Sequence, residues 1–335
     1  MKVSELGEFG LIELLAKKVA GSRGNQASWR QLLIGIGDDA AAWQGNGTVQ
    51  LATTDSLVQD VHFSLETAPW YELGWKALAI SLSDIAAMGG VPRYALVTLA
   101  LPADSEVEDV TALFEGMVEL AQVSGVAIAG GDIVRAALTV ITTTVTGSAP
   151  DQGHVLTRSA AKPGDKIGVT GYLGAAAAGL RMLTEKLELD PEATTHLRRA
   201  FLCPNPRVAE GQLLAGNGVK TAIDISDGLK SDLTHICESS HVGARIEVDR
   251  LPVAPEVKAN FGEESLDLAL SGGEDYELLF TASEGIIDKV TGAASCPVTI
   301  IGDITADKTG KIDLIDRQGK PFHLSKGGWD HFTTG

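Results

Sequence analysis

Aromatic residues and cysteines are scarce in this sequence of 335 residues. Aromatic residues make up 5% of the chain and hydrophobic residues 44%, so the core must consist mainly of Ala, Val, Leu and Ile. The three cysteines, Cys203, Cys237 and Cys296, are odd in number and widely separated. They form neither a disulfide framework nor a zinc-binding spacing, and we expect each to be a small buried residue in a reducing cytoplasm.

We expect neither a targeting segment nor a membrane span in this sequence. Its first residues, MKVSELGEFG, have none of the basic and apolar regions of a signal peptide. The longest apolar region, 77–101, is interrupted by Asp84 and Arg93, so we expect no membrane-spanning segment.

Positive charge is in the minority, because 27 basic residues stand against 44 acidic ones and the formal net charge is −17. This balance argues against binding to nucleic acid or to an anionic membrane. It remains compatible with a phosphorylated ligand, provided that divalent cations lie between the acidic residues and the phosphates.

The length and the turn-rich segment near residue 150 predict two mixed α/β domains, at 1–150 and 151–335. Pro69 is expected to open a long helix, and Ser105 with Glu108 predicts a capping box. Apolar periodicity predicts helices at 8–20, 70–88, 106–123, 174–187, 206–215, 228–239 and about 284–293. Strands are expected at 48–54, 94–101, 126–129, 138–146, 166–171, 220–226, 244–249 and 297–302.

Six short segments share one pattern, in which a small residue at the end of a predicted strand or helix is followed by a carboxylate. Aspartate is common in turns and caps, which is sufficient to explain any single segment. Six recurrences favour a shared role in cation binding. The segments are GIGDDA (35–40), ATTDS (52–56), LSDIAAMGG (82–90), AGGDI (129–133), AIDISDG (222–228) and SGGEDYE (271–277).

Magnesium gives these carboxylates a physical purpose. It takes about six oxygen ligands and usually combines carboxylates with water and nucleotide phosphates. We expect Asp39 to bind the metal and Asp38 to cap its turn, while Thr53 and Thr54 contribute further oxygens.

Common nucleotide-binding and catalytic motifs are absent. There is no P-loop, EF-hand loop, HExxH or GxSxG sequence. GIGDDA superficially fits a dinucleotide fingerprint, but carboxylates at its centre would repel a pyrophosphate. The segment GYLGAAAAGL (171–180) is compatible with a phosphate at a helix N-terminus and equally with a tightly packed alanine-rich helix.

These motifs together resemble the thiamine-monophosphate kinases, which belong to the aminoimidazole-ribonucleotide-synthetase-like superfamily. Related ATP-binding synthetases share glycine–aspartate loops, so single motifs are weakly specific and the ordered set is specific. It covers nearly the whole chain and comprises GEFGLIELL (7–15), GIGDDAA (35–41), TTDSLVQDVHF (53–63), KALAISLSDIAAMGG (76–90), GGDIVR (130–135), TRSAAKPGD (157–165), PNPRV (204–208), IDISDGLKSDL (223–233), SGGEDYELLF (271–280) and GWDHF (328–332).

The resemblance implies an N-terminal α/β domain that binds ATP and magnesium and pairs with its copy in a homodimer, and a C-terminal α/β domain behind it. It implies phosphorylation of thiamine monophosphate to thiamine diphosphate, the last step of thiamine diphosphate biosynthesis, with ATP and Mg²⁺. The implied magnesium ligands are Asp39, Thr53, Thr54, Asp55, Asp84, Asp132, Asp224 and Asp227. The implied ATP contacts are Gly131, Asp132, Arg158 and Ser226, and the implied contacts to thiamine monophosphate are His62, Glu274 and Trp329.

Two positions depart from the family pattern. Asp60 stands where a glycine is usual before the histidine, so the local turn is expected to differ. Ile133 stands where a threonine is common, which removes a hydroxyl near the phosphates.

Several site residues have an ordinary structural alternative. By residue type, Arg158 suits a surface ion pair as well as a phosphate clamp, and His62 suits a structural hydrogen bond. Glu274 suits a turn, or a contact to the aminopyrimidine amine or the thiazolium ring. Trp329 suits a hydrophobic anchor or a stacking contact.

The implied reaction needs positioning and charge neutralisation more than a general base, because the attacking phosphate oxygen is already ionised. We therefore expect direct in-line transfer with no protein nucleophile. The alternatives are another ATP-dependent synthetase of the superfamily and a non-catalytic nucleotide or magnesium sensor. Selenophosphate synthetase is disfavoured because it normally needs a reactive N-terminal Cys or selenocysteine, and the first cysteine here is Cys203.

Overall fold

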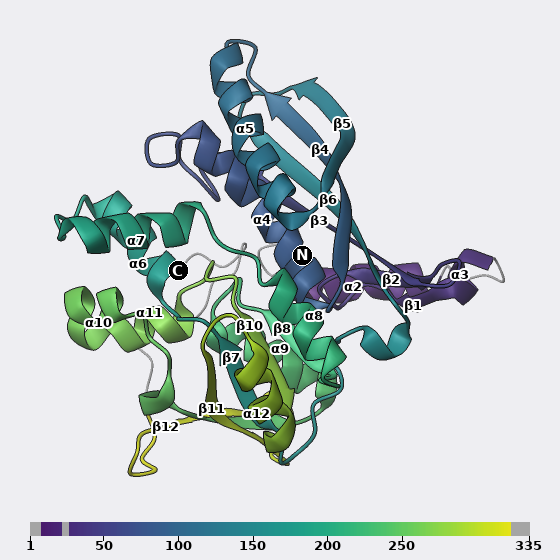
Figure 1. The fold of residues 1–335 in the computed structure, drawn as a ribbon, viewed down its shortest axis with the longest axis vertical. Helices are drawn as coiled ribbons and strands as arrows, with labels where there is room; N and C mark the ends of the chain where they lie inside the picture. Colours follow the sequence, from purple (N-terminus) through teal and green to yellow (C-terminus); the bar gives the residue numbers. More distant parts are fainter. Residues whose placement is uncertain (1–7, 22–26, 323–335) are drawn as a thin grey trace.

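The computed structural model describes residues 8–21 and 27–322, which form two mixed α/β parts, each built on a six-stranded sheet (Figure 1). The first sheet has the order β1-β2-β3-β6-β4-β5 and is antiparallel except for the parallel pair β4–β5. Its elements are α2 (Glu8–Gly21), α3 (Ala27–Gln31), β1 (Leu32–Ile34), β2 (Ala41–Gln44), β3 (Val49–Val58), α4 (Trp70–Ala87), β4 (Val91–Leu101), α5 (Val107–Ser124), β5 (Ala127–Arg135) and β6 (Val140–Ala149).

The second sheet has the order β12-β9-β11-β7-β10-β8, with one parallel pair, β12–β9. The predicted boundary near residue 150 falls between the two sheets. The elements of this part are η1 (Gln152–His154), β7 (Lys166–Thr170), α6 (Ala175–Glu185), α7 (Pro191–Leu202), α8 (Val208–Gly216), β8 (Thr221–Asp224), α9 (Leu229–Ser240), β9 (Gly243–Glu247), η2 (Val248–Arg250), α10 (Pro255–Phe261), η3 (Gly262–Glu264), α11 (Ser265–Ser271), β10 (Leu278–Ala282), α12 (Glu284–Ala293), β11 (Val298–Thr305) and β12 (Ile312–Ile315).

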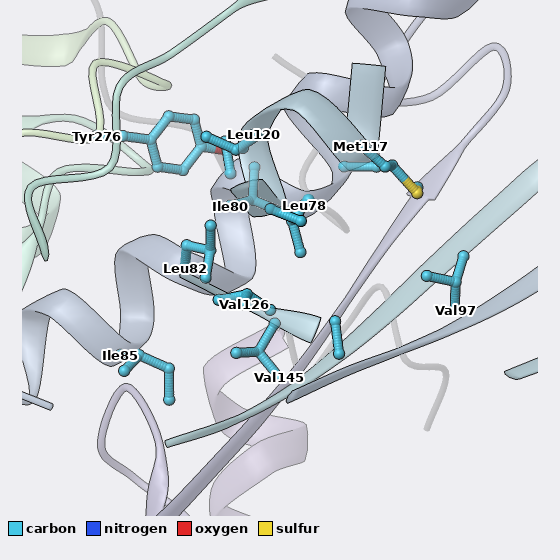
Figure 2. Packing of buried hydrophobic residues seen from close by; sticks show 14 of the residues in the cluster. Leu78, Ile80, Leu82, Ile85, Val97, Met117, Leu120, Val126, Val145 and Tyr276 are labelled. Atoms are coloured by element: carbon cyan, nitrogen blue, oxygen red, sulfur yellow. The ribbon is translucent and has the colours of Figure 1, made fainter. Parts of the chain in front are cut away.

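Helix α4 joins the two parts. Pro69 caps it in an extended conformation, so its fixed φ suits the start of the helix. Thirteen of its 18 residues are buried, on every side of the helix. It packs against α5, β3 and β6 in the first part and against α8 and β8 in the second (Figure 1). Figure 2 shows Leu78, Leu82 and Ile85 of α4 in the main hydrophobic cluster, together with Val145 of β6.

Most long elements predicted from periodicity are confirmed, including the helix expected at 70–88 and the one at about 284–293. The capping box is wrong, because Glu106 is the N-cap of α5 and its side chain makes no capping hydrogen bond. The strand expected at 48–54 continues to Val58, since Thr54 and Ser56 pair with hydroxyl groups of β6.

The sequence did not predict the amphipathic helix α7, nor several short or fully buried elements. Strand β10 is buried along its whole length and follows an acidic motif, so it shows no alternation. Among the described cysteines, Cys237 is buried as expected, whereas Cys203 and Cys296 are half-buried; none forms a disulfide. Across 8–21 and 27–322, no helix has the length and apolar composition needed to span a membrane.

Helices α4 and α5 cross at two glycines. A Cβ atom on Gly74 would lie 1.8 Å from the Leu113 carbonyl oxygen, and one on Gly116 would lie 1.9 Å from the Tyr71 carbonyl oxygen. Both contacts are with backbone, which cannot move aside as a side chain can. The close crossing therefore requires glycine at both positions.

We predict that Gly74→Ala lowers the free energy of unfolding by about 1–3 kcal/mol, because the added methyl group forces the helices apart. The matched control is Gly292→Ala in α12, where a Cβ atom would meet nothing within 4 Å. That change should be neutral or stabilising, since alanine favours the helix. Urea unfolding of both variants tests this, and equal stabilities would contradict the proposed close crossing.

Candidate active site

One large cavity lies between the two parts of the chain. Its volume is about 1280 Å³, and its walls come from the turn before β2, from β3 and α4, and from the loops after β8 and before β10. A typical single-ligand pocket measures about 300–1,000 Å³, so this cavity has room for more than one small molecule. The polar residues of its wall indicate which ligands it can bind.

Three carboxylates meet on this wall. Oxygen atoms of Asp39, Asp84 and Asp224 all lie within 4.8 Å of one another. They come from the turn before β2, from α4 and from the end of β8, so both parts of the chain contribute. Asp55 of β3 lines the same cavity. The strand and helix positions are rigid, which fixes the separation of the charges.

Hydroxyl groups hold the cluster from behind. Thr53 Oγ1 donates to Asp84 Oδ2 at 2.5 Å. Two serines of α4 precede Asp84, and they bind carboxylates that belong to different sheets. Ser81 donates to Asp55 Oδ2 at 2.9 Å, and Ser83 donates to Asp224 Oδ2 at 2.6 Å. One turn of α4 therefore orients carboxylates of both sheets.

The cluster is electrostatically unfavourable on its own. Burial raises the pKa of Asp224 to about 7, and the charge on Asp39 adds to this shift. Burial also raises the pKa of Asp39 and of Asp55, and raises that of Asp84 well above its usual range, with repulsion from Asp55 contributing at Asp84. The folded chain therefore holds these groups close together against a force that favours their neutral forms.

Arg158 is the cation that partly compensates this charge. Its guanidinium makes a short ion pair with Asp39, and its backbone N–H donates to Asp38 Oδ2 at 3.2 Å. Asp38 also accepts from the Asp39 backbone N–H at 3.1 Å, so it holds the turn, as the sequence analysis expects. Arg158 therefore forms an ion pair, but with a buried carboxylate at the wall of the cavity and not at the surface.

The residues present fit a hard divalent cation. All the donors of the cluster are oxygen atoms, which is the ligand type that Mg²⁺ prefers. Asp39 Oδ2 is buried and has no hydrogen-bond partner among the described residues, so one carboxylate oxygen remains available. Asp39, Asp84 and Asp224 are the residues best placed to hold such an ion.

A second group continues the wall along α9. Asp227 and Ser226 line the cavity, and oxygen atoms of Asp227 and Asp232 lie within 4.8 Å of a His235 ring nitrogen. Asp232 is buried, and its Oδ2 accepts the backbone N–H groups of Asp227 and Gly228 at 3.3 and 3.1 Å. Asp232 thus fixes the turn that carries Asp227.

Each of the three carboxylates in the segment 271–277 contacts a different element. Glu274 lines the cavity and pairs with Lys76 of α4. Asp275 accepts the backbone N–H groups of Gly174 and Ala176 at the start of α6. Glu277 accepts two hydrogen bonds from Arg207, at 2.5 and 2.6 Å. Only Glu274 of the three faces the cavity.

The contact of Asp275 decides between the two interpretations of GYLGAAAAGL. The N-terminal N–H groups of α6 already bind the protein's own carboxylate. A phosphate there would meet Asp275 directly, so the phosphate interpretation is wrong. The alanine-rich helix is packed instead, with Ala175, Ala176 and Ala178 buried.

His62 lines the cavity next to the β3 end. Its Nδ1 accepts the Val58 backbone N–H at 3.0 Å, which sets the orientation of the ring. Asp60 has a φ of 64°, the left-handed region that glycine favours. The turn therefore retains a glycine-like backbone with aspartate in place of glycine.

Most implied site residues meet at the cavity, and a minority do not. Thr53, Thr54, Asp55, Arg158, Ser226, Asp227, His62 and Glu274 all line it with the three clustered carboxylates. Gly131 and Asp132 lie on β5, three strands from β3 and so about 14 Å away along the sheet. A single chain does not bring these two to the cavity, and Trp329 lies outside the described residues.

The residues that support this site were not predicted from the sequence; they include Lys76, Ser81, Ser83 and Asp232. A signal for one of them exists. Lys76, Ile80 and Asp84 are spaced by four residues, so they lie on one face of α4. The carboxylates were found because they recur beside small residues, whereas supporting groups carry no such pattern.

Both parts of the chain match a known protein family, and its curated relatives are similar over nearly their full length. Residues 37–149 match the N-terminal domain of AIR synthase related proteins, and residues 162–315 match the C-terminal domain. The thiamine-monophosphate kinase of Escherichia coli K12 is 40% identical over 334 residues, with 98% of this chain and 99% of the relative covered. That of Bacillus subtilis is 38% identical over 311 residues, covering 89% and 93%. The solved structure of AaThiL complexed with AMPPCP and TMP is 30% identical, covers 99% of each chain and has a TM-score of 0.85.

We predict that Mg²⁺ raises the melting temperature of the protein and that Asp84→Asn removes most of this rise. Without metal, at a pH at which Asp84 is ionised, Asp84→Asn should melt about 1–2 °C above the parent, because one repelling charge is lost at a gain of about 1 kcal/mol. Asn can still accept from Thr53. Thermal melts with EDTA and with Mg²⁺ measure both effects, and the exposed Asp288→Asn is the control. A full Mg²⁺ response in Asp84→Asn would contradict metal binding by this cluster.

Proposed function

The chain belongs to the AIR synthase related protein family, and we propose that it is an ATP-dependent kinase that phosphorylates thiamine monophosphate to thiamine diphosphate. The observation that carries the proposal is the carboxylate cluster on the wall of one large cavity, in a chain whose near-full-length relatives are thiamine-monophosphate kinases. A cavity with room for two ligands suits a reaction between two phosphorylated molecules.

The reaction requires the protein to hold two anionic substrates next to each other. The terminal phosphate of thiamine monophosphate is ionised at neutral pH, so its oxygen can attack the γ-phosphorus of ATP without a general base. A direct in-line displacement forms the new P–O bond as the bond to ADP breaks. No protein nucleophile is needed.

The chain's own residues supply position and charge. Asp39, Asp84 and Asp224 are the proposed ligands of Mg²⁺, with Asp55 and Asp227 on the same wall. When bound, Mg²⁺ would neutralise phosphate charge and stabilise the charge that develops during transfer. Arg158 offers a planar guanidinium at the wall to a nucleotide phosphate.

The remaining contacts are assigned to the two substrates. We assign Ser226 to ATP, and His62 and Glu274 to thiamine monophosphate, because all three line the cavity with the cluster. Trp329 is retained as a proposed substrate contact on the motif GWDHF alone. We place the enzyme in the cytoplasm, in keeping with its free cysteines.

We also propose that the protein is a homodimer formed through the first part of the chain. Within residues 8–21 and 27–322, strand β5 is the edge of its sheet and pairs only with β4. Its residues are exposed with one exception, and Ile133 is 69% exposed. Exposed apolar residues on an open edge strand favour a protein interface. The same strand carries Gly131 and Asp132, so their implied roles in nucleotide and metal binding would be met at this interface.

Incubation of the purified protein with ATP, Mg²⁺ and thiamine monophosphate should yield thiamine diphosphate, with ATP consumption that depends on the acceptor. Asp84→Asn and Asp132→Asn should each reduce turnover by about 100-fold or more without changing the circular dichroism spectrum, because charge stabilisation is lost. Near-normal turnover in both variants would refute the metal assignment. ATP binding without turnover would indicate a nucleotide sensor. Product formation only with a different acceptor would indicate another synthetase of the same superfamily.

Light scattering should give a mass twice the 35.0 kDa of one chain. Ile133→Asp should yield monomers, because a charge would be buried at the β5 interface. Val123→Asp, at a position on α5 that is 73% exposed, should leave the dimer intact. A monomeric parent protein, or a dimer that tolerates Ile133→Asp, would contradict this interface.

A further inference from the structure

Lys76 lies on the same face of α4 as Asp84, about two turns closer to the N-terminus of the helix. The two residues are eight positions apart, which corresponds to about 12 Å along the helix axis. Ile80 lies between them and lines the cavity, as does Asp84. One helix face thus runs from the proposed phosphoryl-transfer centre to a second, more apolar region.

The ammonium group of Lys76 is almost completely buried. The side chain is 3% exposed, and lysine is rarely buried to this extent without compensation. Lys76 Nζ lies 2.6 Å from Glu274 Oε1 and 3.7 Å from the centroid of the Phe201 ring. A carboxylate and an aromatic face therefore compensate one buried charge.

The two groups that Lys76 holds are themselves cavity walls. Glu274 and Phe201 both line the cavity, whereas Lys76 does not. They arrive from separate elements, a loop before β10 and helix α7. Ala177 and Leu180 of α6 line the cavity as well and provide apolar surface. An acidic group beside an aromatic ring and an apolar wall suits a flat, nitrogen-rich organic ring.

The backbone at Glu274 needs such an anchor. Glu274 has a φ of 70° and Tyr276 has a φ of 50°, so two non-glycine residues adopt the left-handed conformation within three positions. The Glu274 backbone N–H donates to the Ser226 carbonyl at 2.8 Å. The side chain is 26% exposed and is anchored at one oxygen by Lys76. Because Glu274 lines the cavity, its carboxylate is accessible to a ligand there.

We propose that Lys76 is a positioning residue that holds Glu274 and Phe201 in place as the wall that receives the organic rings of the acceptor substrate. The inference rests on the proposed kinase function. Without the ammonium group, Glu274 would turn toward solvent and Phe201 would lose its fixed partner. Acceptor binding would weaken, whereas the metal and ATP contacts, to which Lys76 makes no ion pair, would remain.

Lys76→Met tests this proposal, because methionine keeps an unbranched side chain and removes the charge. We expect it to raise KM for thiamine monophosphate by about tenfold, the equivalent of about 1.4 kcal/mol, with kcat and KM for ATP within about twofold of the parent. Lys166→Met is the matched control. It breaks an ion pair of the same 2.6 Å length, between Lys166 and Asp303, outside the cavity, and both KM values should stay unchanged.

A double-mutant cycle separates positioning from simple stabilisation. If Lys76 acts through Glu274, Lys76→Met should raise KM for thiamine monophosphate little further in a Glu274→Gln background. Multiplicative effects, or equal increases in KM for both substrates, would overturn the proposal. If Lys76→Met alone does not fold, the double variant carries neither charge, and its KM is compared with that of Glu274→Gln in the same way.

The same experiment distinguishes failure of this inference from failure of the proposed function. A parent protein that does not phosphorylate thiamine monophosphate would refute the function. A parent protein that does so, with an unaltered KM in Lys76→Met, would refute the role of Lys76 alone.

Discussion

The structure depends on holding several carboxylates close together in a partly dehydrated site. Burial and mutual repulsion raise the pKa of Asp84 and Asp224, so the cluster opposes folding wherever its members are ionised. Hydroxyl donors and one guanidinium offset part of this unfavourable energy; they belong to Thr53, Ser81, Ser83 and Arg158. Such an arrangement suits a protein that binds divalent cations and phosphates, because bound cations would neutralise the negative charge of the clustered carboxylates.

Helix α4 makes this arrangement geometrically secure. It is buried on all sides and touches both sheets, so its residues have little freedom to move apart. Asp84 near its C-terminal end and Lys76 two turns earlier serve different regions of one cavity. A rigid helix then fixes the distance between the proposed site of phosphoryl transfer and the proposed site that binds the organic rings, more precisely than a flexible loop would.

The acidic motif at 271–277 shows that similar residues in one short segment have different tasks. Asp275 caps α6 and Glu277 binds Arg207, so both stabilise the loop. Glu274 alone faces the cavity. The two buried contacts hold the left-handed backbone that presents Glu274, which explains why a strained loop persists beside the site.

The sequence by itself determined most of the long amphipathic elements, though not α7, together with the mixed α/β class and the recurrent carboxylates, because each depends on local periodicity or composition. Only the tertiary structure decided that Asp39, Asp84 and Asp224 meet, that Asp275 occupies the α6 terminus, and that Lys76 pairs with Glu274. These contacts join residues 45 to almost 200 positions apart, and no local rule contains them. The tertiary structure also places Asp132 on a strand far from the cavity. The order of strands in a sheet follows from chain topology, not from the motif that surrounds the residue.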